Sequence, residues 1–272
     1  MKSFEFIKMH GLGNDFVIID NSENIIEIKN KETLKRLGSR NFGVGCDQIL
    51  IIESNNFKEA KVSIFNNDGV ESGACGNGVR CVASYLMNKG NTNNIKIITI
   101  SGNLDCWIEN NNCFVNMGKP LFKWTQIPLA KKVESQIIKI DQFELFCLSM
   151  GNPHGVIFFE DEDELNKVDI ESIGKKIQSN YIFPESINVE FACILKDKTI
   201  RMKVWERGVG RTLACGSGAC ATLVAAKHKN LSQRKNDIIL DGGKLTINWL
   251  ENDDIIMSGE VKLVFKGNFY SD

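Results

Sequence analysis

Several features that would assign the chain to a common class of protein are missing from it. No run of about 18 apolar residues is present, so we expect no membrane-spanning helix and no membrane partner. The first eight residues place charges within their apolar stretch, which is unlike a signal peptide. Lysine and arginine number 33 and aspartate and glutamate 34, a net charge of -1, so no basic surface for a nucleic-acid partner is expected.

Signatures of a bound metal or cofactor are also missing. The nine cysteines include no Cys-x-x-Cys pair, and only His10, His154 and His228 could act as imidazole ligands, so no metal site is expected. A Gly-x-x-x-x-Gly-Lys-Ser/Thr loop is absent and no lysine lies in an evident Schiff-base context, so we expect no nucleotide and no pyridoxal cofactor. An odd number of cysteines without an export signal favours free thiols in a reducing cytoplasm.

The sequence does contain one cysteine on a glycine-rich turn in each half of the chain. The turns read Ala74-Cys75-Gly76-Asn77-Gly78 and Ala214-Cys215-Gly216-Ser217-Gly218, and a helical run follows each of them. A Gly-Asn pair, ending at Asn14 and at Asn152, precedes each cysteine at a similar distance. This repeated order of motifs is typical of a duplicated domain.

The apolar patterns predict a mixed α/β (α+β) fold. Helices are expected at residues 77–89 and 217–229, and both are apolar on most faces, so each should be buried within a curved, mostly antiparallel sheet. Residues 31–40 and 161–180 are expected to form surface helices, and residues 126–142 to be β-like. The expected strands are residues 16–20, 49–53, 61–65, 95–100, 113–117, 156–159, 189–194, 200–205 and 244–249.

A cysteine at the start of a buried helix is equipped for acid–base chemistry. The helix end carries N–H groups without intrahelical partners and about half a positive charge, which would hold a substrate carboxylate and favour a thiolate. We therefore expect Cys75 and Cys215 to ionise most readily, one removing a proton from a carbon and the other returning one to its opposite face. The alternative is that these are small residues at tight contacts between helix and sheet.

Polar residues flank short glycine-containing loops in both halves. They are Asn14, Gln48, Asn66, Asn152, His154, Asn188, Glu206 and Arg207. Glu206 and Arg207 offer one acceptor and one two-pronged donor, suited to a zwitterionic amino acid, although a solvent-exposed ion pair is the alternative. The other cysteines are expected to pack as small apolar residues; these are Cys46, Cys81, Cys106, Cys113, Cys147, Cys193 and Cys220.

These motifs together resemble one family, the diaminopimelate epimerases, over nearly the whole chain. The matching segments are MHGLGNDF (9–16), GVGCDQ (43–48), FNNDG (65–69), CGNGVRC (75–81), MGNPH (150–154), Asn188, ERGVG (206–210), ACGSGA (214–219) and Gly-Gly-x-Leu (242–245). The resemblance implies cofactor-independent epimerisation of LL-diaminopimelate to meso-diaminopimelate in lysine and peptidoglycan precursor synthesis. It also implies a homodimer, and two pseudo-symmetric domains with the active site in the cleft between them. We place the first domain at residues 1–120, with a returning tail of about 261–272, and the second at residues 121–260.

The resemblance also implies roles for individual residues. Cys75 and Cys215 would be the acid/base pair, and His154 and Glu206 would adjust the pKa values of these thiols. The amides of Gly76-Asn77 and Gly216-Ser217 would hold the reacting carboxylate. The rest of the substrate would be held by Asn14, Asn66, Asn152, Asn188 and Arg207, with Gln48 and Glu206 beside them.

The chain departs from the family's usual pattern at three places. Arg211 stands where the family usually has glutamate, Cys46 replaces a small or aromatic residue, and Ser72-Gly73-Ala74 is smaller than the common choice. Arg211 reverses a charge close to Cys215, which keeps open a racemase or epimerase for another amino acid, such as lanthionine or histidine. A non-catalytic amino-acid-binding module is a further alternative, but binding alone would need neither Cys75 nor Cys215.

Overall fold

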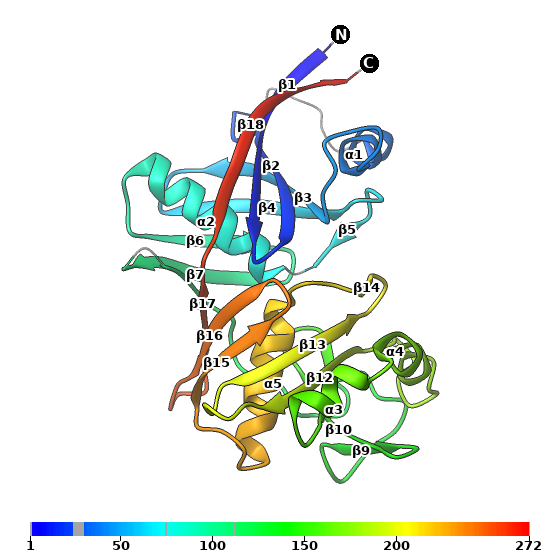
Figure 1. The fold of residues 1–272 in the computed structure, drawn as a ribbon. Helices are drawn as coiled ribbons and strands as arrows, with labels where there is room; N and C mark the ends of the chain where they lie inside the picture. Colours follow the sequence, from blue (N-terminus) through cyan, green and yellow to red (C-terminus); the bar gives the residue numbers. More distant parts are fainter. Residues whose placement is uncertain (1, 24–29, 74, 111, 272) are drawn as a thin grey trace. The chain divides into compact units, whose positions relative to one another are not determined.

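The structure is a computed structural model that describes residues 2–23, 30–73, 75–110 and 112–271, so Ala74 lies outside the described residues. The chain divides into two compact units (Figure 1). Unit 1 comprises Met1–Asn116 and Gly259–Asp272, and unit 2 comprises Met117–Ser258. The boundaries expected from the sequence, at residues 120 and 260, lie a few residues from these bounds.

Unit 1 is one curved sheet around one helix. Its strands pair in the order β18-β1-β2-β3-β4-β6-β7-β8, parallel at β2–β3 and β4–β6 and antiparallel elsewhere, with β5 paired to β4. Helix α2 (Gly76–Gly90) contacts six of these strands, and α1 (Lys31–Gly38) packs against β3. The strands are β1 (Lys2–Gly11), β2 (Asn14–Asp20), β3 (Gln48–Asn55), β4 (Glu59–Asn66), β5 (Glu71–Ser72), β6 (Asn94–Thr99), β7 (Gly102–Glu109), β8 (Asn112–Asn116) and β18 (Lys262–Ser271).

Unit 2 repeats this arrangement. Its strands pair in the order β9-β10-β11-β12-β13-β15-β16, again with two parallel pairs, β11–β12 and β13–β15. Helix α5 (Gly216–His228) contacts β10, β11, β12, β13, β15 and β16, while α3 (Glu162–Lys167) and α4 (Ile170–Gln178) pack on β12. The strands are β9 (Ile137–Ile140), β10 (Phe143–Ser149), β11 (Pro153–Phe158), β12 (Asn188–Ile194), β13 (Ile200–Glu206), β14 (Gly210–Arg211), β15 (Lys235–Leu240), β16 (Gly243–Trp249) and β17 (Ile255–Gly259).

The two central helices are buried because they are apolar nearly all round. In α5 every residue from Gly218 to Ala226 is buried, and in α2 the buried stretch runs from Asn77 to Ala83 and resumes at Leu86 and Met87. A helix of this kind is stable only where neighbouring elements cover every face. The predicted mixed α/β fold, with a sheet wrapped around a central helix, is confirmed in each unit.

Two predictions about secondary structure were correct only in part. Residues 161–180 form two helices and not one, because Val168 adopts an extended conformation and Asp169 then caps α4 by accepting a hydrogen bond from the Ser172 N–H at 3.1 Å. Within residues 126–142, β9 is a strand, but the part before it consists of turns and bends. Ile127 and Leu129 are nevertheless buried in the core of unit 2, so this segment packs without joining the sheet.

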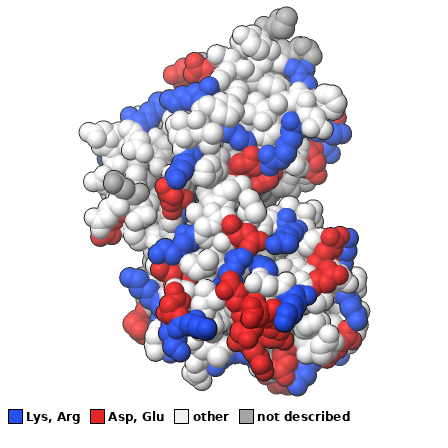
Figure 2. All heavy atoms as spheres, in the orientation of Figure 1, with Lys and Arg blue, Asp and Glu red and all other residues white. Residues whose placement is uncertain are grey.

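Charged residues of both signs are interspersed over the face shown in Figure 2. This agrees with the nearly equal numbers of basic and acidic residues, 33 and 34. Among the described residues, no helix combines the length and apolar character needed to cross a membrane.

The central position of α5 can be tested through stability. Leu223 lies on α5 with no exposed surface, whereas Leu231 just beyond the helix is 41% exposed. We expect Leu223→Ala to lower the free energy of unfolding by about 2–5 kcal/mol, because it leaves a cavity inside the sheet. Urea denaturation measures this loss, and Leu231→Ala is the matched control with little expected effect. Equal losses in the two variants would contradict the enclosed helix.

Candidate functional site

Cys75 begins helix α2 and has its sulfur at the helix end. Its backbone is extended (φ -153°, ψ 95°), and its Sγ accepts a hydrogen bond from the Gly78 N–H at 3.3 Å. A β-carbon on Gly78 would lie 2.9 Å from a Leu50 side-chain carbon and 3.3 Å from this sulfur, so glycine is what lets the turn close. Cys75 is half-buried, as a group that meets a ligand should be.

Asn14 lies beside this sulfur and is held in place by charged groups. Its Oδ1 is 3.8 Å from Cys75 Sγ and accepts from Asn77 Nδ2 at 3.3 Å, while its Nδ2 donates to Asp47 at 2.8 Å. Asp47 is in turn bound by Arg40, which also bridges to Asp15. The sequence motifs GNDF and GCDQ therefore meet at one ion-paired cluster that orients Asn14.

Gln48 and Asn66 meet where β3 begins and β4 ends. They face one another in the antiparallel register, and Gln48 Nε2 donates to Asn66 Oδ1 at 3.0 Å. The same Nε2 lies 3.4 Å from the Ser72 hydroxyl on β5. The predicted site residues of unit 1 therefore form two small groups. Asn14 and Asn77 lie near Cys75, and Gln48 lies beside Asn66.

Cys215 occupies the equivalent position at the start of α5 but has a different environment. It is only 5% exposed, and its pKa is raised well above 9.0, first by burial and then by the nearby carboxylates of Glu206 and Glu190. The prediction that the helix end makes Cys215 a readily formed thiolate was therefore wrong. Burial and two nearby carboxylates raise its pKa more than the hydrogen bonds from Gly218 and Ser217 lower it.

Glu206 is itself perturbed. Burial raises its pKa, while hydrogen bonds from Thr212 and Cys215 oppose that rise. The Thr212 hydroxyl donates to Glu206 Oε1. Glu206 therefore lies next to the Cys215 thiol. The role expected from the sequence, adjusting the pKa of that thiol, requires such a contact.

His154 is completely buried and lies between two site residues. Its Nδ1 is 2.7 Å from Glu190 Oε1, and its Nε2 is 3.0 Å from Asn152 Oδ1. Asn152 Nδ2 donates to the Ser217 hydroxyl at 3.3 Å. The sequence analysis missed Glu190, although a carboxylate within the apolar run Asn188–Ile194 is a signal, because a buried charge needs a partner.

Asn188 connects the remaining polar groups of unit 2. Its Nδ2 donates to the Pro153 carbonyl at 2.9 Å, and its Oδ1 accepts from the Arg207 N–H at 2.9 Å. The exposed guanidinium of Arg207 donates to the Glu185 carbonyl at 3.1 Å, so its recorded partner is a backbone oxygen rather than Glu206. This leaves the Arg207 side chain near the surface, where a ligand can reach it.

Arg211, the departure from the family pattern, is held by an acid. Its guanidinium forms an ion pair with Asp241 at 3.0 Å, and Arg201 binds the same carboxylate. Burial acts to raise the pKa of Asp241, but the two arginines lower it below its usual value, so that the carboxylate stays ionised and offsets the reversed charge at position 211.

Most of the other cysteines behave as core residues. Burial raises the pKa of Cys46 to about 12 and that of Cys113 to about 11, and it raises the pKa values of Cys81, Cys106, Cys147 and Cys193 as well. A thiol that resists ionisation is a poor nucleophile and a poor base. Among the described residues, no group of three or more His, Cys, Asp or Glu side chains is arranged to hold a metal ion.

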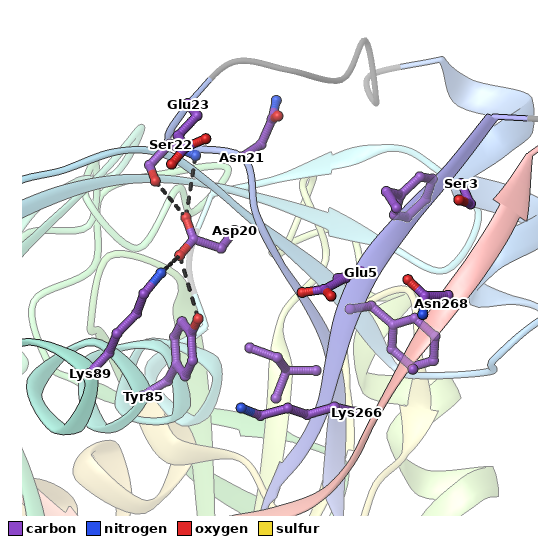
Figure 3. Close-up of a pocket in the computed structure, with 14 residues that line it drawn as sticks. Ser3, Glu5, Asp20, Asn21, Ser22, Glu23, Tyr85, Lys89, Lys266 and Asn268 are labelled. Carbon is purple, nitrogen blue, oxygen red and sulfur yellow. Dashed lines mark hydrogen bonds and ion pairs between the residues drawn. The ribbon is translucent and has the colours of Figure 1, made fainter.

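A separate hollow of about 550 Å³ lies in unit 1 beside β1, β18 and the end of α2 (Figure 3). In it Lys89 and Ser22 bind Asp20 at 2.8 and 2.7 Å and hold its pKa below 3.8, although burial acts to raise it. None of the site residues predicted from the sequence lines this hollow. The polar groups around Asp20 already bind one another, and the hollow is not the candidate site.

Comparison with known proteins shows which family the sequence matches. The sequence profile described as diaminopimelate epimerase matches residues 6–123 and 146–264. Diaminopimelate epimerase of Acidiphilium cryptum is 42% identical over 267 residues, covering 96% of this chain and 95% of that protein. The enzyme of the same name from Carboxydothermus hydrogenoformans is 38% identical over 275 residues, covering 98% and 99%.

Solved structures of more distant proteins share the fold. A predicted epimerase from Pseudomonas aeruginosa has a TM-score of 0.71 at 12% identity, covering 99% of this chain and 100% of that one. A probable proline racemase from Agrobacterium radiobacter has a TM-score of 0.68 at 13% identity, covering 98% and 93%. From the matched profile and the full-length relatives, the chain belongs to the diaminopimelate epimerase family.

Proposed function

We propose that the protein is an isomerase that interconverts LL- and meso-diaminopimelate by two-thiol proton transfer. The observation that carries this proposal is the placement of Cys75 and Cys215 at the first turns of the two buried helices. The names of the family's close relatives supply the substrate. Both thiols have to reach opposite faces of one α-carbon for the reaction to proceed.

The helix ends are suited to the reacting carboxylate. The backbone N–H groups at Gly76-Asn77 and Gly216-Ser217 lie in the first turns of α2 and α5, where N–H groups lack intrahelical partners. Donors at this position stabilise the charge that develops on the carboxylate as the α-proton leaves. We assign the other end of the substrate to Asn66, Asn152, Asn188 and Arg207, with Asn14, Gln48 and Glu206 beside them.

The two thiols have different roles in one turnover. Cys215 is buried beside Glu206, and its raised pKa keeps it protonated, so we assign it the donor role in the first direction. Cys75, half-buried with an N–H donated to its sulfur, then removes the α-proton. One proton moves from carbon to Cys75 and one from Cys215 to carbon, so thiol and thiolate have changed places at the end. The reaction needs no cofactor, and a reducing cytoplasm would keep both thiols available.

Replacing each cysteine tests this assignment. We expect Cys75→Ala and Cys215→Ala each to lower kcat by about two to four orders of magnitude, because each removes one of two obligatory proton carriers. Cys81→Ala and Cys220→Ala are matched controls, since these cysteines lie on the same two helices. Formation of meso-diaminopimelate from the LL isomer, followed by chiral chromatography, measures the rates. Retained turnover in either catalytic variant would contradict the two-thiol mechanism.

We also propose that the protein is a homodimer and that β18 contributes to the contact. Four large apolar side chains of this strand are exposed: Leu263 (51%), Val264 (53%), Phe265 (46%) and Tyr270 (58%). Exposed large apolar side chains that gather on one element commonly mark a protein–protein interface. Pairing two copies of β18 would remove these side chains from water.

Sedimentation analysis tests the dimer. We expect the wild-type chain to sediment at twice its mass of 30.5 kDa and Leu263→Asp to shift it towards the monomer, because the charge would be buried in the contact. Leu231→Asp places the same charge at another exposed leucine and should remain dimeric. A monomeric wild type, or a Leu263→Asp variant as dimeric as the control, would contradict the proposal.

A further inference from the structure

Glu190 is a buried carboxylate that the mechanism above does not use. It lies on β12 with no exposed surface, and its Oε2 has no hydrogen-bond partner among the described residues. The titratable groups that face it come from the surrounding elements: Cys147 on β10, His154 on β11, Glu206 on β13 and Cys215 at the start of α5. The imidazole of His154 is the one basic group in this set.

The carboxylate approaches the catalytic thiol closely. A β-carbon on Gly218 would lie 2.7 Å from Glu190 Oε1 and 3.2 Å from Cys215 Sγ. A contact of 2.7 Å is too short for a real side chain, so glycine at this position admits the carboxylate to the first turn of α5. The position of the Glu190 carboxylate therefore explains why residue 218 is a glycine.

A continuous chain of polar contacts connects Glu190 to Cys215. Glu190 Oε1 is 2.7 Å from His154 Nδ1, and His154 Nε2 is 3.0 Å from Asn152 Oδ1. Asn152 Nδ2 donates to Ser217 Oγ at 3.3 Å, and Ser217 Oγ is 3.7 Å from Cys215 Sγ. All of its members lie in unit 2.

We propose that Glu190 is a positioning residue that holds His154 as a doubly protonated imidazolium and so directs the hydroxyl hydrogen of Ser217 towards Cys215. The proposal rests on the acid–base role assigned to Cys215 above. It explains why a carboxylate is retained inside the sheet, where an unpaired charge would be strongly destabilising.

The direction of the chain follows from its donors and acceptors. In the proposed state both ring nitrogens of His154 donate to the oxygen atoms that they face, and an imidazole that donates twice is positively charged. Glu190 supplies the counter-charge at 2.7 Å. Ser217 Oγ accepts from Asn152, which leaves its own hydrogen for Cys215 Sγ. Every donor between His154 and the sulfur then points towards Cys215.

This direction matters because Cys215 has to become a thiolate in one half of the catalytic cycle. Burial and the carboxylates of Glu206 and Glu190 raise its pKa, and a hydroxyl donor to the sulfur acts in the opposite sense. The hydrogen bonds of the chain reverse their direction when the side-chain amide of Asn152 is rotated by half a turn, so that its oxygen and nitrogen exchange places. A neutral His154 would then accept from the Asn152 amide, the Ser217 hydroxyl would donate to Asn152, and Cys215 would be held as a thiol that donates to Ser217.

The first test uses the unaltered protein and no substrate. The chain has three histidines, so nitrogen-15 NMR of histidine-labelled protein resolves His154 once His10→Gln and His228→Gln have assigned the other two signals. We expect both ring nitrogens of His154 to carry protons at pH 7. A neutral ring, with one nitrogen unprotonated, would overturn the proposal.

The second test removes the charge of Glu190 and keeps its shape. The glutamine of Glu190→Gln can still accept a hydrogen bond from His154 Nδ1, but it favours a neutral His154 and the reversed chain. The pKa of Cys215 should then rise by about one unit, so alkylation of Cys215 by iodoacetamide at pH 8 should slow by roughly tenfold. If Glu190 acted on Cys215 only through its negative charge, removing that charge would lower the pKa of the thiol. Alkylation of Cys215 would then become faster. Site-resolved mass spectrometry measures the rate, and the exposed Glu134→Gln is the matched control.

An unchanged or faster rate in Glu190→Gln would overturn the proposal. If that variant does not fold, the NMR measurement on the unaltered protein decides alone. Neither measurement involves diaminopimelate, so an error in the assigned substrate leaves both results interpretable. Conversely, an active epimerase with a neutral His154 would refute this inference without affecting the proposed reaction.

Discussion

Enclosure of one apolar helix by its own sheet is the constraint on which each unit depends. A sheet that curves around a helix covers every face of it, which is why α2 and α5 carry so few charged residues. The first turn of each helix lies beside polar side chains of neighbouring strands, Asn14 of β2 at Cys75 and Glu206 of β13 at Cys215. Burial of the helix therefore places a cysteine, backbone N–H groups and polar side chains together.

The two copies of this arrangement differ in their electrostatics. Cys75 is half-buried with amide groups and an N–H donor around its sulfur, whereas Cys215 is buried beside carboxylates. A two-thiol reaction needs this inequality, because the thiols must be in opposite protonation states when the substrate binds. The fold that the two units share gives the two cysteines equivalent positions, and residues such as Glu190 and Glu206 supply the asymmetry.

Much of the fold could be predicted because its signals are local. The apolar runs of α2 and α5, and the glycine-rich turns before them, are visible in the sequence itself. The break at Val168-Asp169 was missed because the segments on both sides read as helix. The state of Cys215 could not be predicted from its own motif, since it depends on Glu190 and Glu206, which β12 and β13 bring to the helix. Glu190 left a detectable signal, a carboxylate in a strand whose other residues, apart from Asn188, are all apolar.

Among possible measurements, proton NMR of the reduced protein with LL-diaminopimelate in D2O tests the central claim most directly. With no cofactor added, the account predicts loss of the α-proton signal together with appearance of the meso isomer, because thiols that have exchanged with solvent return deuterium to the carbon. Complete retention of the α-proton signal by folded, reduced protein would contradict the assigned reaction and direct attention to another amino acid as the substrate.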